Sequence, residues 1–204
     1  MPNARSRRNA IPPPKSGARR PVIWLAGAAA GLVTLAIVGW AVLNQGGQPG
    51  GSTAGGGHSG VTLVAYQGAE TLGGKRVDLG AVLGKGKPVV LNFFAGLCPP
   101  CRAEMPGFEQ VWQRYKDQFV LLGADIGPFL DLGSHDDAKR LLADLGITYP
   151  AAYVEENVVS RFRIAGMPTT VLYDAQGDEV GRHTGLMTED QLEAAVQALI
   201  ADTP

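Results

Sequence analysis

The sequence has few of the residues that hold metal ions or build disulfide frameworks. Among its 204 residues there are only two cysteines and three histidines. The histidines, at positions 58, 135 and 183, stand far apart and show none of the spacings typical of metal ligands. A scaffold of several disulfides is excluded. No cofactor is expected beyond a redox-active pair formed by the two cysteines themselves.

Acidic residues are absent from the first 60 positions. Residues 1–20 form a basic segment with six cations, and the rest of the chain holds the other 12 cations and all 19 acids. The main domain is therefore acidic overall. Because phosphate binding needs clustered cations, this balance argues against nucleic acid as a partner. The basic segment needs a different explanation.

Charge is also missing from one long apolar run, residues 22–43, with the sequence VIWLAGAAAGLVTLAIVGWAVL. As a helix it would be about 33 Å long, close to the thickness of the hydrocarbon core of a bilayer. Trp24 and Trp40 stand near its ends, where membrane helices carry aromatic belts. A buried core helix would show polar interruptions, and a cleavable signal peptide usually has a shorter apolar region.

We therefore predict one transmembrane helix at residues 21–43 that anchors the protein in the cell membrane by a single pass. The positive-inside rule places residues 1–20 in the cytoplasm and the domain that follows outside it. Residues 44–60 contain eight glycines and no large apolar side chain. Such a segment cannot repay the entropy of ordering, so a flexible linker is expected there.

From residue 61 the chain alternates short apolar strands with amphipathic helices, which is typical of an α/β domain over residues 61–204. An N-terminal hairpin is expected around Gly73 and Gly74, and Thr188 with Gln191 forms a capping box for the last helix. The predicted strands are 61–66, 75–79, 87–94, 119–126, 169–174 and 179–185. The predicted helices are 99–116, 135–146, a short one near 156–162, and 188–201.

Both cysteines lie in one stretch, LNFFAGLCPPCRAEMP at residues 91–106, where a central strand ends and a helix begins. The amide hydrogens and partial positive charge of a helix N-terminus stabilise a thiolate, which would make Cys98 a nucleophile. Cys101, one turn later and more buried, is placed to resolve a mixed disulfide. The alternatives are a metal site, which lacks further ligands, and an inert bridge, which closes too short a loop to stabilise much.

This stretch resembles the active site of membrane-anchored thioredoxin-like proteins of the TlpA, ResA and DsbE group. The resemblance covers residues 61–202 and includes the hairpin, the extra strand and helix near 119–146, and GMPTTVLYDAQG at 166–177. It implies a thioredoxin-like fold, with a central mixed sheet flanked by helices, and an extracytoplasmic thiol-disulfide oxidoreductase. It also implies a cis peptide bond between Met167 and Pro168 that faces the cysteines. A strand-leading proline with an ordinary bond is the alternative at this position.

The function that the resemblance implies is reduction of disulfides in specific protein substrates, such as apocytochrome c. Electrons would come from a membrane partner protein. The alternative is a copper metallochaperone, or an assembly factor for a respiratory oxidase, that uses the same thiols. Tight copper binding by the reduced protein with poor disulfide exchange would favour this second function.

Three positions depart from patterns known in related proteins. Gly96 and Leu97 replace the threonine and tryptophan usual in the family. Leu97 still gives an apolar rim for partner docking, but it lacks the hydrogen-bond donor and the area of an indole. Asn92 takes the place of the buried aspartate of cytoplasmic thioredoxins, as in ResA-like relatives. Glu104 shares one helical face with Phe108 and is our candidate for the missing proton carrier, because a half-buried carboxylate resists ionisation. The alternative is a solvated glutamate in the first helical turn.

Overall fold

The computed structural model describes residues 58–203. The basic segment, the predicted membrane helix and most of the predicted linker therefore lie outside the described residues. Within 58–203, no helix is long and apolar enough to cross a membrane.

One seven-stranded mixed sheet forms the centre of the domain, in the order β2-β1-β5-β4-β3-β6-β7. β3 is parallel to β4 and antiparallel to β6, and all six of its residues are buried. This agrees with the continuous apolar run that predicted a central strand. The strands are β1 (Thr62–Gln67), β2 (Arg76–Asp78), β3 (Val89–Phe94), β4 (Val120–Asp125), β5 (Ala151–Val154), β6 (Thr169–Tyr173) and β7 (Glu179–Thr184).

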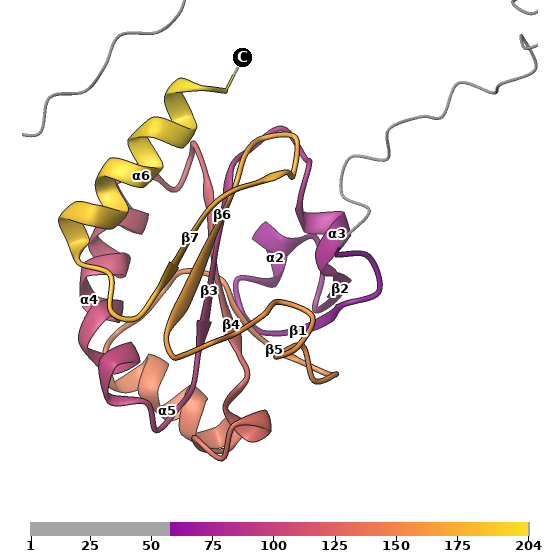
Figure 1. Ribbon diagram of the computed structural model, residues 1–204, viewed down its shortest axis with the longest axis vertical. Helices are drawn as coiled ribbons and strands as arrows, with labels where there is room; N and C mark the ends of the chain where they lie inside the picture. The colour runs from indigo at the N-terminus through magenta and orange to yellow at the C-terminus, as the bar shows by residue number, and fades with distance from the viewer. Residues whose placement is uncertain (1–57, 204) are drawn as a thin grey trace, which may run out of the picture. The chain divides into compact units, whose positions relative to one another are not determined.

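Helices cover this sheet, with α4 and α6 side by side along one of its faces (Figure 1). Alternate residues of β3 face opposite sides, so Val90 and Phe94 join the apolar cluster beneath α4, whereas Leu91 and Phe93 join a second cluster on the other side. The helices are α2 (Ala69–Leu72), α3 (Leu79–Val82), α4 (Pro99–Tyr115), η1 (Gly127–Phe129), α5 (His135–Asp144) and α6 (Glu189–Ala201).

The predicted capping box of the last helix is confirmed. The Thr188 side chain accepts from the backbone of Gln191, and the Gln191 side chain accepts from the Thr188 backbone. A second capping box, formed by Ser134 and Asp137, starts α5 and was not predicted.

The short helix predicted near residues 156–162 is wrong, because that segment forms turns. The Asn157 side chain accepts from the amide of Val159, which competes with helical bonding. One helix-like bond, from the Phe162 amide to the Val158 carbonyl, is followed at once by Arg163 with φ 50°. Four short elements were also not predicted as they stand: β5, α2, α3 and η1.

Candidate active site

The cysteines lie at the junction that the sequence predicts, between the end of β3 and the start of α4. They form a disulfide with an S–S distance of 2.08 Å and a Cα–Cα distance of 5.3 Å. Cys98 is the N-cap of α4, and its sulfur accepts a hydrogen bond from the amide of Cys101 at 3.3 Å. Pro99 and Pro100 occupy the first two helical positions and have no amide hydrogen to offer.

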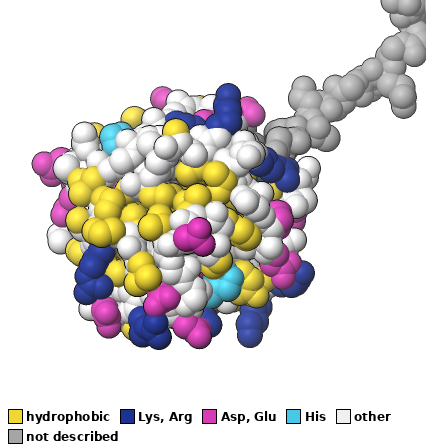
Figure 2. Space-filling view, turned by 60° about the horizontal axis from the view of Figure 1, so that its bottom comes forward, with side chains coloured by type: hydrophobic (Ala, Val, Ile, Leu, Met, Phe, Trp, Pro, Cys, Tyr) yellow, Lys and Arg dark blue, Asp and Glu magenta, His cyan; other side chains and the backbone are white. Residues whose placement is uncertain are grey.

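Only one sulfur of the disulfide is accessible, and its surroundings are mostly apolar. Cys98 is 3% exposed and Cys101 is fully buried, so an incoming sulfur can reach only Cys98. Leu97, 61% exposed, stands beside it and lines a hollow of about 250 Å³ together with Pro99 and Arg102. Figure 2 turns this end of the domain toward the viewer and shows hydrophobic side chains gathered across the face, with an acidic side chain among them and further charged side chains around them.

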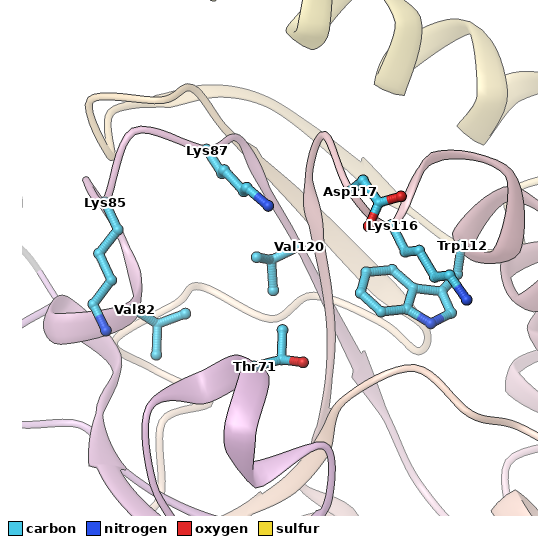
Figure 3. Close-up of a pocket in the computed structure, with 8 residues that line it drawn as sticks. All are labelled: Thr71, Val82, Lys85, Lys87, Trp112, Lys116, Asp117 and Val120. Carbon is cyan, nitrogen blue, oxygen red and sulfur yellow. The ribbon is translucent and has the colours of Figure 1, made fainter.

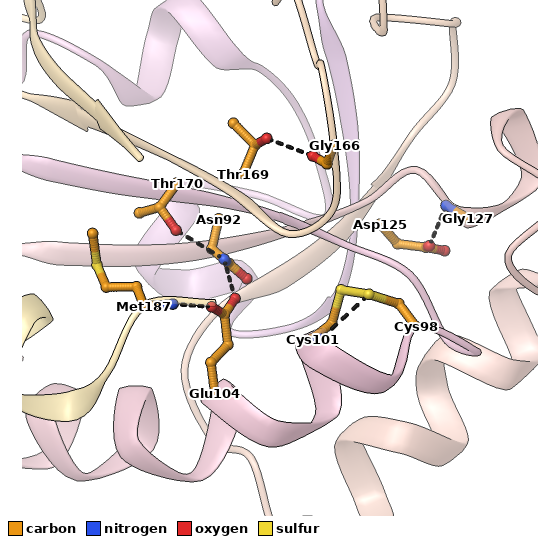
Figure 4. The surroundings of a disulfide bond; sticks show 10 residues. All are labelled: Asn92, Cys98, Cys101, Glu104, Asp125, Gly127, Gly166, Thr169, Thr170 and Met187. Carbon is orange, nitrogen blue, oxygen red and sulfur yellow. Dashed lines mark hydrogen bonds between the residues drawn. A yellow bond between two sulfur atoms is a disulfide. The ribbon is translucent and has the colours of Figure 1, made fainter. Parts of the chain in front are cut away.

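Glu104 is buried, as the candidate proton carrier requires. It lies three residues after Cys101 on the same helix and is only 3% exposed. One carboxylate oxygen accepts from Asn92 Nδ2 at 2.8 Å, and the other accepts from the backbone amide of Met187 at 3.0 Å (Figure 4). Burial raises the pKa of Glu104 to about 7, and the two hydrogen bonds offset only part of this rise. The group can therefore take up and release a proton near neutral pH.

Asn92 connects Glu104 to the next strand. Its amide also donates to Thr170 Oγ1 at 3.1 Å, and all three side chains are buried. Asn92 points to the α4 side of the sheet because it lies between Val90 and Phe94 on the alternating strand β3. The Asn92 amide thus holds one oxygen of the Glu104 carboxylate in place, and it adds no second titratable group.

The Met167–Pro168 peptide bond is cis, as the resemblance implied. Met167 packs against the apolar cluster that contains both cysteines. Thr169 begins β6 directly after the proline, and its hydroxyl donates to the carbonyl of Gly166 at 2.7 Å. The loop before β6 therefore packs against the cluster that contains the cysteines, and the role of Pro168 in catalysis remains a prediction.

A buried cluster around Asp125 was missed by sequence reasoning. This fully buried carboxylate ends β4, and it accepts from Tyr66 Oη at 2.8 Å and from the Gly127 amide at 2.9 Å. Its oxygen also lies 2.7 Å from Nδ1 of His135, whose ring stacks on Tyr153. The only sequence signal was an acid at the end of an apolar strand.

Gly96, in the loop before Cys98, lies directly against the backbone of α5. A Cβ on Gly96 would lie 2.4 Å from the Ala138 nitrogen and 2.5 Å from the Asp137 carbonyl carbon in the first turn of α5. The Leu97 amide donates to the carbonyl of Leu132. The glycine that departs from the family pattern thus lets α5 approach the redox loop.

The remaining histidines lie in other surroundings. His58 stacks on Phe162, and His183 Nε2 lies 3.1 Å from the Leu186 carbonyl oxygen. In the part of the chain that the structure describes, no three residues of the types His, Cys, Asp and Glu are grouped closely enough to hold a metal ion.

Comparison with known proteins agrees with this geometry. Residues 76–200 match the family described as Thioredoxin-like domain. The chain is 34% identical over 131 residues to the thiol-disulfide oxidoreductase ResA of Halalkalibacterium halodurans. The aligned region covers 64% of this chain and 71% of that protein. It is 30% identical to the thioredoxin-like protein YneN of Bacillus subtilis, over 61% of this chain and 71% of the relative.

Two solved structures are also similar. A secreted disulfide oxidoreductase of Mycobacterium tuberculosis, described as homologous to DsbE, superposes with a TM-score of 0.53 at 26% identity, covering 68% of this chain and 95% of that one. A thiol:disulfide interchange protein of Chlorobium tepidum gives a TM-score of 0.54 at 25% identity, covering 68% and 94%.

Proposed function

The chain belongs to the thioredoxin-like domain family, and on that premise we propose that it reduces disulfides of specific protein substrates outside the cytoplasm. It is a thiol-disulfide oxidoreductase of the ResA/DsbE type, with Cys98 and Cys101 as its cysteine pair. The Cys98 sulfur has a single amide donor, because Pro100 has no amide hydrogen, and a thiolate stabilised by so few donors makes the pair more reducing. The observation that carries the proposal is therefore this single bond, from the Cys101 amide to the sulfur of Cys98 at the helix N-terminus. It marks the more accessible sulfur as the one whose thiolate the backbone stabilises.

In the proposed reaction the Cys98 thiolate attacks one sulfur of a substrate disulfide. The substrate S–S bond breaks, its other sulfur leaves as a thiolate, and a mixed disulfide forms. Cys101 then gives its proton to the Glu104 carboxylate and attacks the Cys98 sulfur. The mixed disulfide breaks and the second substrate sulfur leaves. The substrate has gained two electrons, and the Cys98–Cys101 pair, which has lost them, must be reduced again by a donor.

The proposed setting is the outer face of the cell membrane, with residues 21–43 as the anchor and a membrane protein as the electron donor. The basic segment and the uncharged run support this topology. Apocytochrome c is a proposed substrate because of the family resemblance alone. A reporter enzyme fused after residue 204 tests the topology. We expect activity only from a reporter that works outside the cytoplasm, and a cytoplasmic signal would reverse the orientation.

The assignment of the two cysteines is tested by trapping. We expect Cys101→Ser to accumulate a mixed disulfide with a model peptide disulfide, because the first attack still occurs and the resolving thiol is gone. Cys98→Ser should form almost none, since Cys101 is fully buried. Mass spectrometry of the adducts measures both. Equal trapping by the two variants would overturn the roles given to them.

A further inference from the structure

A second site lies at the end of the domain opposite to the disulfide. It is a pocket of about 450 Å³ between the start of β3, the start of β4 and the end of α4. Because β3 has six residues, this end of the strand is about 20 Å from the end that leads to Cys98. The pocket therefore has no direct part in the disulfide chemistry.

Three lysines surround this pocket, in a domain whose acids outnumber its cations. The ammonium group of Lys87 points toward the centre, and Lys85 and Lys116 stand on opposite sides (Figure 3). Lys116 donates to the neutral side chain of Gln113 at 3.2 Å. Within residues 58–203, none of the three lysines forms an ion pair with a carboxylate, whereas the exposed Lys139 pairs with Asp136. The pocket thus concentrates positive charge that the described residues leave largely unneutralised.

The floor of the pocket is apolar. It consists of Val82 from α3, Val120 from β4 and the indole of Trp112, which is 7% exposed. Thr71 adds a hydroxyl, and Asp117 adds one carboxylate that would oppose an anion. An apolar floor contributes nothing to binding a free inorganic anion, but it favours a ligand whose anionic group is joined to an apolar stem.

We propose that this pocket binds the phosphate-bearing headgroup of an anionic amphiphile, with a membrane phospholipid as the source. The phosphate would lie between Lys87 and its two neighbouring lysines, and the stem would cover Val120 and Trp112. The first described residues of the chain contact α3, which supplies part of the pocket floor. The Gly60 amide donates to the Asp78 carboxylate immediately before α3, the helix that supplies Val82. A headgroup bound here would hold the disulfide end of the domain away from the lipid surface.

The fluorescence of Trp112 provides the test. In the full chain, kept in a non-ionic detergent, Trp24→Phe and Trp40→Phe leave Trp112 as the single tryptophan. Dihexanoyl phosphatidic acid, added as monomer, should give a saturable change in emission. Dihexanoyl phosphatidylcholine should give none over the same range, and inorganic phosphate should bind at least about tenfold more weakly.

Variants identify the groups responsible. Lys87→Gln should weaken binding of the phosphatidic acid by about tenfold, because one charge-assisted hydrogen bond is lost. Asp117→Asn should strengthen it, and the control Lys139→Gln should leave it unchanged. Equal binding of both lipids, or wild-type affinity in Lys87→Gln, would overturn the site. Equal affinity for inorganic phosphate would overturn the lipid as its source. If emission does not change, calorimetry on the same samples decides, and the absence of saturable heat would also overturn the proposal.

Discussion

Glu104 places an ionisable group in the apolar layer between the sheet and α4. Its carboxylate has two hydrogen-bond donors, from Asn92 and the Met187 backbone, yet burial still raises its pKa from the ordinary 4.5 to about 7. The free-energy cost of removing the charged carboxylate from water is larger than the stabilisation that the two hydrogen bonds provide. The folded protein therefore holds this proton more tightly than the unfolded chain does. That difference appears both in stability and in catalysis.

The stability effect has a definite sign. Because the folded pKa is higher, the folded state binds more protons between pH 4.5 and 7, and the free energy of unfolding contributed by Glu104 falls as pH rises through this window. The full effect is about 3 kcal/mol. Glu104→Gln should remove this slope. Urea unfolding at pH 4.5, 6 and 8 measures it, and Asp117→Asn, which changes an exposed carboxylate just after the same helix, is the control. An unchanged slope would show that Glu104 is not the titrating group.

The same substitution, Glu104→Gln, should also change the rate of disulfide exchange. If Glu104 accepts the proton of Cys101, then Glu104→Gln should slow the resolution of mixed disulfides by about 100-fold and remove an inflection near pH 7 from the rate profile. The first attack by Cys98 should change little. Stopped-flow exchange with a model disulfide separates the two steps. A profile that keeps its inflection would assign the proton to another group.

At the scale of elements, α5 is held to the redox loop by backbone contact at Gly96. An alanine there would place its Cβ against the α5 backbone, which cannot rotate away. We expect Gly96→Ala to lower the free energy of unfolding by about 1–3 kcal/mol and to shift the redox potential, because the loop before Cys98 must move. The control is Gly166→Ala, whose Cβ would meet only a methyl group of Thr184 at 3.3 Å. Equal costs at both glycines would refute the special role of the α5 contact.

The Asp125 cluster joins β1, β4, η1 and α5 through one buried carboxylate. Asp125→Asn keeps the shape but replaces one accepting oxygen with a donor that faces other donors. We expect a loss of about 2–3 kcal/mol in chemical unfolding. Asp136→Asn, which changes only an exposed pair with Lys139, should cost less than about 0.5 kcal/mol. If the two variants lose similar stability, the cluster is not an anchor of α5.

Long elements with local signals were predictable from the sequence. Examples are the buried run of β3, the two cysteines at the start of α4 and the capping box of α6. Each of these signals is contained within a few neighbouring residues of the sequence. β5 was missed because four residues after a proline carry too little periodicity. The Asp125 cluster was missed because Tyr66 and Asp125 are 59 positions apart and meet only through sheet pairing. The burial of Glu104 could be predicted because the apolar residues of its helical face follow the helical repeat. Its bond to the Met187 amide could not, because it spans 83 positions and depends on where α6 docks.

The direction of electron flow is a property of the whole molecule. It depends on the difference in free energy between the reduced and the oxidised protein. An N-cap side chain is reached by the amides at the second and third helical positions. Here the second is Pro100, so only the Cys101 amide reaches the Cys98 sulfur. With fewer donors the thiolate is less stabilised, the reduced form is less favoured, and the couple is more reducing.

We therefore expect the full chain, equilibrated with glutathione buffers, to have a potential well below that of glutathione. A value near about −120 mV, the range of strong oxidants, would contradict this. Pro100→Ala should raise the potential by about 30–60 mV, because it restores one charge-assisted hydrogen bond to the thiolate. Pro99→Ala restores an amide at the first helical position, which the N-cap sulfur does not reach, so it is the matched control and should change the potential less. Equal shifts in the two variants would show that the prolines act through the shape of the turn and not through their missing amides.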